Sequence, residues 1–107
     1  MNKKSIIKNT TSYEERLLEK LKQDPELAQD YLEAAVKEYD KDGNVDALLL
    51  AMRDVAEAQG GIGALAKKTD ISRQHLYQIL TSKHKPRLDN WLDIIAGLGF
   101  KIRLESI

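Results

Sequence analysis

Most of the structural information in this chain lies in one stretch, Ile62-Gly63-Ala64-Leu65-Ala66-Lys67-Lys68-Thr69-Asp70-Ile71-Ser72-Arg73-Gln74-His75-Leu76-Tyr77-Gln78-Ile79-Leu80. The spacing predicts a helix over residues 62–69, a tight turn at Asp70 and Ile71, and a second helix over 73–80 with Ser72 as its N-cap. Apolar residues stand where the angle between two such helices must be filled, at Leu65, Ile71, Leu76 and Ile79. The stretch therefore predicts a helix-turn-helix.

The outward face of the second helix carries side chains that are typical of DNA recognition. With the apolar positions turned inward, four side chains are forced outward together: Arg73, Gln74, Tyr77 and Gln78. An Arg can bridge O6 and N7 of guanine, and a Gln can bridge N6 and N7 of adenine. Ser72 and the free amides of the helix start can hold a phosphate. The alternative is a pair of amphipathic helices with a solvated polar face.

A basic loop, Lys83-His84-Lys85-Pro86-Arg87, follows this helix. Phosphate contacts fix the register of a protein on DNA, whereas base contacts carry the sequence preference. Lys83, Lys85 and Arg87 are therefore predicted phosphate ligands. A last helix is expected over residues 88–98, with Trp91 on its apolar stripe and hence in the core.

The formal net charge of zero hides a division between the two halves of the chain. Residues 9–57 hold thirteen acidic and six basic side chains, a net of −7. Residues 67–87 hold one acidic and six basic side chains, a net of +5. The first half would repel a polyanion and the second would attract one. Two ordinary solvated faces are the alternative.

The acidic half is predicted to be helical. Ser12 as N-cap and Glu15 form a capping box, and Asp24 with Pro25 starts a second helix. Asn44 caps a third helix, whose apolar residues recur at helical spacing. The predicted domains are a flexible N-terminal arm (residues 1–11), an acidic helical region (12–59) and a helix-turn-helix DNA-binding region (60–107).

Composition and motifs exclude several classes of protein. The chain has no cysteine, which removes thiolate chemistry and Cys-based zinc sites. A possible calcium loop starting at Asp40 lacks the Gly and Glu that its sixth and twelfth places require, where Val45 and Ala51 stand. Without a catalytic triad or a Gly-rich phosphate loop, we expect no enzyme, no cofactor and no metal. The chain contains neither a membrane span nor a signal peptide, so we expect a soluble, cytoplasmic protein.

The C-terminal residues alternate between apolar and charged side chains in Phe100-Lys101-Ile102-Arg103-Leu104-Glu105. This alternation predicts a short, half-buried β-strand. A lone strand needs a partner for its backbone groups, either residues 5–8 of the same chain or its own copy across a two-fold axis. We favour the copy, because a two-fold axis also provides two recognition helices for two DNA half-sites. Phe100, Ile102 and Leu104 are then the predicted dimerisation residues of a homodimer.

The second half of the chain resembles the Cro/CI-type helix-turn-helix family. The resemblance rests on Leu65-Ala66-Lys67-Lys68, Ile71-Ser72-Arg73, Lys85-Pro86 and Leu98-Gly99, and covers residues 60–100. Its main departure is Asp70, which stands where a Gly is usual in the turn. The resemblance implies an all-α, lambda-repressor-like helix-turn-helix bundle, here with an N-terminal helical extension and a short C-terminal β-strand.

With its front half included, the chain resembles the addiction-module antidote proteins, antitoxins of the HigA-like type. The added motifs are Ser12-Tyr13-Glu14-Glu15, Asp24-Pro25-Glu26, residues 48–56 and Gly60-Gly61. The resemblance implies an antitoxin that masks a small basic RNase toxin and represses the operon encoding both. The acidic half would suit such a cationic partner, with Tyr13 and Tyr39 as candidate contacts. The alternative function is a Cro/CI-type transcriptional repressor without a toxin partner.

Overall fold

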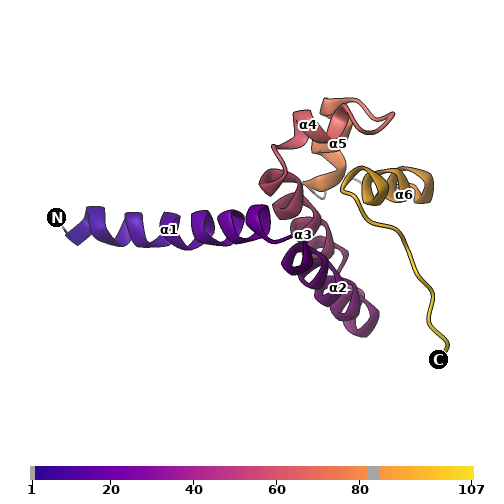
Figure 1. The fold of residues 1–107 in the computed structure, drawn as a ribbon, viewed down its shortest axis with the longest axis horizontal. Coiled ribbons are helices and arrows are strands. Elements are labelled where there is room, and N and C mark those ends of the chain that lie inside the picture. Colours follow the sequence, from indigo (N-terminus) through magenta and orange to yellow (C-terminus); the bar gives the residue numbers. More distant parts are fainter. Residues whose placement is uncertain (1, 82–84) are drawn as a thin grey trace.

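The chain folds into α-helices joined by short connections. The computed structural model describes the backbone of residues 2–81 and 85–107, and the side chains of these ranges from Tyr13 onward. Its helices are α1 (Asn2–Gln23), α2 (Pro25–Asp42), α3 (Val45–Ala58), α4 (Ile62–Ala66), α5 (Arg73–Leu80) and α6 (Leu88–Gly97). Figure 1 shows α1 projecting from a body formed by the other helices, with the C-terminal residues running away from α6 as a separate extended segment. The predicted all-α class is therefore confirmed.

Helix α3 is the centre of the body, because it packs against α1, α2, α4 and α5. Its side chains Met52 and Val55 are completely buried. A single apolar cluster extends from Leu21 of α1 through α3 to Leu76 of α5 and Ile94 of α6. The acidic first half and the basic second half therefore share one core, and α3 contributes to both.

Local sequence signals set the ends of α2 and α3 as predicted. The Oδ1 atom of Asp24 accepts hydrogen bonds from the backbone N–H groups of Glu26 and Leu27 at 3.1 and 3.2 Å. Gly43 ends α2 in the left-handed conformation, with φ of 68°. Asn44 then caps α3 by accepting from the Ala47 N–H at 3.2 Å. These contacts confirm the N-caps predicted at Asp24 and Asn44.

The start of α1 differs from the prediction. The helix begins at Asn2 rather than after Ser12, and so includes most of the segment expected to be a flexible arm. No Gly or Pro interrupts residues 2–23, so nothing in the sequence stops the helix from extending towards the N-terminus. A capping pattern marks a place where a helix can begin, but it does not stop an upstream helix from running through.

The predicted C-terminal β-strand is wrong. Within the described residues there is no strand, and residues 101–107 have no regular secondary structure. One candidate partner, residues 5–8, belongs to helix α1. Alternation only gives a segment one apolar and one charged side. A strand also needs a second segment whose backbone groups pair with its own, and alternation does not provide one.

A hydrogen bond between α2 and α3 supports a first prediction. The Tyr31 hydroxyl donates to Oδ2 of Asp54 at 2.7 Å. Burial and this carboxylate raise the pKa of Tyr31 well above its ordinary value, so the hydroxyl stays protonated and keeps donating. We expect Tyr31→Phe to lower the free energy of unfolding by about 1.5 kcal/mol, the usual scale for a hydrogen bond to a charged group.

Urea unfolding monitored by circular dichroism measures this loss. Tyr39→Phe, at an exposed tyrosine of the same helix, is the matched control. Equal effects of the two substitutions would show that the Tyr31 contact contributes nothing to stability.

Candidate nucleic-acid interface

The stretch that predicted a helix-turn-helix forms α4, a turn over residues 67–72, and α5. We call these parts together the two-helix unit. Helix α4 ends at Ala66, three residues before the predicted end at Thr69. The Thr69 hydroxyl oxygen accepts from the N–H of Ile71 at 3.2 Å, which stabilises the turn. The Asp70 N–H donates to Oδ2 of Asp93 at 3.1 Å and ties the turn to α6.

The inward side of the two-helix unit is apolar, as predicted. Leu65, Ile71, Leu76 and Ile79 are all buried. With one face of the eight-residue helix α5 buried, its opposite face points outward. The unit is compatible with a helix-turn-helix, in which such a face is presented to a DNA groove.

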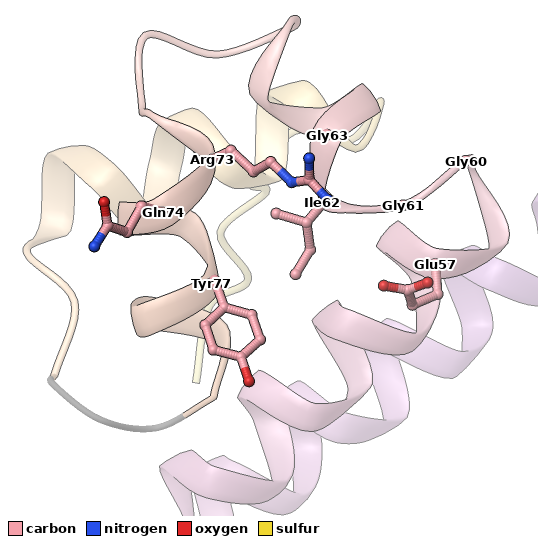
Figure 2. A pocket seen from close by; sticks show the side chains of 8 residues that line it. All are labelled: Glu57, Gly60, Gly61, Ile62, Gly63, Arg73, Gln74 and Tyr77. Atoms are coloured by element: carbon pink, nitrogen blue, oxygen red, sulfur yellow. The ribbon is translucent and has the colours of Figure 1, made fainter.

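The N-terminus of α5 presents the predicted reading side chains. The Ser72 hydroxyl accepts from the His75 N–H at 3.1 Å, which confirms Ser72 as the N-cap. Arg73, Gln74 and Tyr77 are exposed, and Gln78 is half-buried. Figure 2 shows Arg73 and Tyr77 projecting from α5 towards a hollow that Gln74 also lines, with the Gln74 side chain pointing away from the other two.

The opposite side of this hollow could not be recognised from the sequence. Glu57 of α3 lines it, together with the chain that links α3 to α4, residues 60–63 (Figure 2). Gly60 and Gly61 have φ values of 114° and 95°, which a residue with a side chain rarely adopts. The two glycines thus allow the sharp reversal that brings Glu57 close to the outward face of α5.

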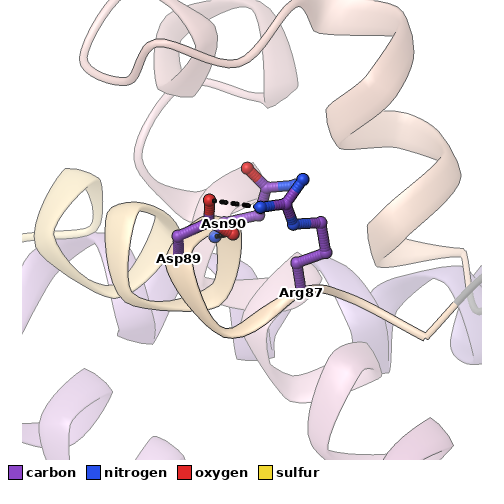
Figure 3. Close-up of polar contacts among 3 residues, drawn as sticks. All are labelled: Arg87, Asp89 and Asn90. Carbon is purple, nitrogen blue, oxygen red and sulfur yellow. Dashed lines mark hydrogen bonds and ion pairs between the residues drawn. The ribbon is translucent and has the colours of Figure 1, made fainter.

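The basic loop is only partly described. Lys85 and Arg87 are exposed, whereas Lys83 lies outside the described residues. Nη2 of Arg87 lies 3.3 Å from Oδ2 of Asp89, as Figure 3 shows. Both side chains of this ion pair are mostly exposed, so water and salt screen it and it holds Arg87 weakly. A phosphate could therefore take the place of Asp89 as the partner of Arg87.

Helix α6 packs very closely against the two-helix unit at Gly97. A Cβ atom at this position would lie 2.8 Å from Cγ2 of Thr69 and 2.9 Å from Cδ1 of Leu65. We expect Gly97→Ala to destabilise the fold by about 2 kcal/mol, because the added carbon forces these neighbours apart. Thr69→Ser removes Cγ2 but keeps the hydroxyl, so Gly97→Ala should be less harmful in that background.

Thermal unfolding of the two single variants and the double variant forms a double-mutant cycle. Additive losses in this cycle would mean that Gly97 does not approach Thr69 as closely as the structure shows.

The predicted dimerisation residues lie at the end of the chain. Phe100 is half-buried against the core, and its N–H donates to the Ile95 carbonyl at 3.1 Å. Ile102 is 45% exposed and Leu104 is 97% exposed. Apolar side chains this accessible to water are available for contact with a partner.

Two further properties concern the described residues as a whole. None of their helices is long and apolar enough to cross a membrane. Their His, Asp and Glu side chains form no group of three that could hold a metal ion.

Comparison with known proteins identifies the family of this chain. A family model described as "probable addiction module antidote protein" matches residues 13–106. The chain belongs to this family, which spans α2 to α6 and part of α1. Neither the curated proteins nor the solved structures contain a match to the chain. Membership identifies the chain as an antidote of an addiction module, implies a toxin partner, and indicates a regulatory rather than an enzymatic role.

Proposed function

We propose that this protein is a sequence-specific DNA-binding antitoxin that represses its own operon and neutralises a basic RNase toxin. The observation that supports the DNA-binding part is the outward face of α5, where Arg73, Gln74 and Tyr77 line one hollow, within a stretch of sequence (67–87) whose net charge is +5. Antidote family membership carries the antitoxin part. A protein that binds operator DNA and an RNase toxin would act in the cytoplasm, and we propose this location.

The DNA-binding proposal divides the side chains of the interface into two sets. Arg73, Gln74, Tyr77 and Gln78 would contact base edges, because they stand on the face of α5 opposite its buried residues. Ser72, Lys83, Lys85 and Arg87 would contact phosphates on either side. Lys67 and Lys68, exposed in the turn, add to the positive field that attracts the DNA backbone.

The toxin-binding proposal concerns the acidic half. Most of its carboxylates are exposed on α1 and α2, where they are free to meet a cationic surface. An RNase must hold a polyanion and so carries positive charge near its active site. Tyr13 and Tyr39, 68% and 43% exposed, supply aromatic contact area on the same helices.

We propose that the protein acts as a homodimer, with Phe100, Ile102 and Leu104 at the contact between its two copies. A dimer carries two copies of α5, so it can read two half-sites on one face of the duplex. The exposure of Ile102 and Leu104 supports this proposal, since each copy has apolar surface to cover.

A binding experiment tests the reading residues. We expect the protein to retard duplex DNA from its own promoter in a native gel, and Arg73→Ala to weaken binding about tenfold or more. The loss should be confined to the native operator. The Arg73→Ala variant should therefore bind an operator altered at one or two base pairs as tightly as it binds the native operator. Gln78→Ala should relax preference at a different position.

Lys41→Ala, in the acidic half, is the matched control that removes one cation outside the interface. A protein that binds no promoter duplex at low salt, or an Arg73→Ala variant with unchanged sequence preference, would contradict this assignment.

A further inference from the structure

A second hollow lies on the side of the body where α1 meets α2, the C-terminal end of α3 and the end of α6. Its apolar floor combines buried and half-buried side chains: Leu18, Leu21, Ala28, Ala58 and Phe100. Three exposed carboxylates border it, Glu15, Glu19 and Glu57, against a single cation, Lys22. We call this hollow the acidic groove. A ligand that fits it must be apolar on one side and positively charged on the other.

Residues 101–104, the first part of the C-terminal tail (residues 101–107), have this character, and Glu105 follows on the basic side. Ile102 and Leu104 are apolar, while Lys101 and Arg103 alternate with them. In an extended chain, alternate side chains point to opposite sides, so the apolar pair would share one side and the basic pair the other. All residues of the tail are exposed; among its apolar side chains, Ile102 is 45% and Leu104 is 97% exposed. Among the described residues, Leu104 is thus almost uncovered by its own chain, and Ile102 is covered only in part.

We propose that the acidic groove of one copy binds the C-terminal tail of a second copy. Ile102 and Leu104 would cover the groove floor, and Lys101 and Arg103 would lie near the carboxylates at its border. The exchange would be reciprocal, because a two-fold axis relates each tail to the groove of the other copy. No β-strand is required, since side chains rather than a backbone ladder make the contact.

The position of Phe100 explains why the tail would leave its own groove. Phe100 lines the groove, so the tail starts inside it and would have to turn back sharply to fill the same hollow. Residues 101–104 contain no Gly, Pro, Asn or Asp, the residues that form tight turns. The tail therefore favours an extended path away from its own groove, as it follows in Figure 1. Seven extended residues reach about 23 Å, which bounds the separation of the two grooves.

Sedimentation equilibrium tests the contribution of the tail and of the groove charges. We expect the protein to be a dimer, and Leu104→Asp to raise its dissociation constant at least tenfold, with no change in thermal stability of the monomer. The double reversal Glu15→Lys with Glu19→Lys should have a similar effect. Glu14→Lys with Glu38→Lys makes the same change in net charge at two exposed sites outside the groove lining, and should leave the dimer intact.

Engineered cysteines test the exchange itself, because the native chain has none. A tagged chain with Leu18→Cys and an untagged chain with Leu104→Cys are mixed and oxidised gently. We expect a disulfide between the two chains, visible as a mixed species on a non-reducing gel. Val36→Cys, at an exposed site on α2 outside the groove lining, replaces Leu18→Cys in the control mixture and should give little of that species.

Three results would overturn the proposal. The first is a protein that stays monomeric at all concentrations, and the second is equal cross-linking by Leu18→Cys and Val36→Cys. The third concerns one chain that carries both Leu18→Cys and Leu104→Cys: if its disulfide forms only within the monomer, the tail occupies its own groove. The first result would also overturn the proposed homodimer, on which this inference rests. The second and third results would leave that homodimer, DNA binding and toxin neutralisation standing.

Discussion

Raising the salt concentration from 50 to 200 mM is expected to weaken operator binding by the dimer about 10⁵-fold. The reason is the release of counterions from DNA when Lys and Arg side chains neutralise phosphates. With about five phosphate contacts per subunit, the logarithm of the binding constant should fall against the logarithm of salt concentration with a slope near −9. Fluorescence anisotropy with a labelled operator, repeated at several salt concentrations, measures this slope.

Two substitutions locate these phosphate contacts. Lys85→Ala and Arg87→Ala should each weaken binding to all sequences alike and reduce the slope by about 2, since a dimer loses two contacts. Lys41→Ala removes the same charge from the acidic half and should leave the slope unchanged. A slope near zero for the unmodified protein would exclude phosphate contacts as the basis of binding.

Features set by neighbouring residues could be predicted from the sequence. Asp24, Asn44 and Ser72 cap their helices as expected, because an N-cap contact reaches only two or three residues along the chain. The buried positions of the two-helix unit, such as Leu76 and Ile79, followed from helical periodicity. Such short-range rules fixed which face of α5 is turned outward, and thereby which side chains were candidates for DNA contact.

Features set by distant residues could not be predicted in this way. The hydrogen bond between Tyr31 and Asp54 joins two helices, and no pattern in either helix marks it. The close approach at Gly97 depends on how α6 crosses the turn that contains Thr69. Glu57 reaches the hollow beside α5 only because the chain reverses at Gly60 and Gly61. The false strand at residues 100–105 has the same origin, since strand formation depends on a partner that lies elsewhere.

The second large effect expected is that toxin neutralisation and DNA binding can each be removed by substitution without loss of the other. We predict that Glu33→Lys with Glu38→Lys, on the exposed face of α2, abolishes rescue of cells that express the toxin. Reversing two carboxylates turns attraction of a cationic partner into repulsion, which slows association by about 10-fold to 10³-fold. Growth of cells that co-express the adjacent reading frame measures rescue, and DNA binding by the same variant should be retained.

Lys85→Glu with Arg87→Glu is the complementary variant, because it changes charge by the same amount in the basic loop. It should abolish operator binding and still rescue growth. Whole-chain variants are needed, because α3 packs against helices of both halves and a cut after residue 59 would open the shared core. If the α2 variant rescued growth as well as the unmodified protein, the toxin would bind elsewhere on the antidote. If the adjacent frame were harmless when expressed alone, the proposed pairing with an RNase toxin would fail, and operator binding would stand as a separate function.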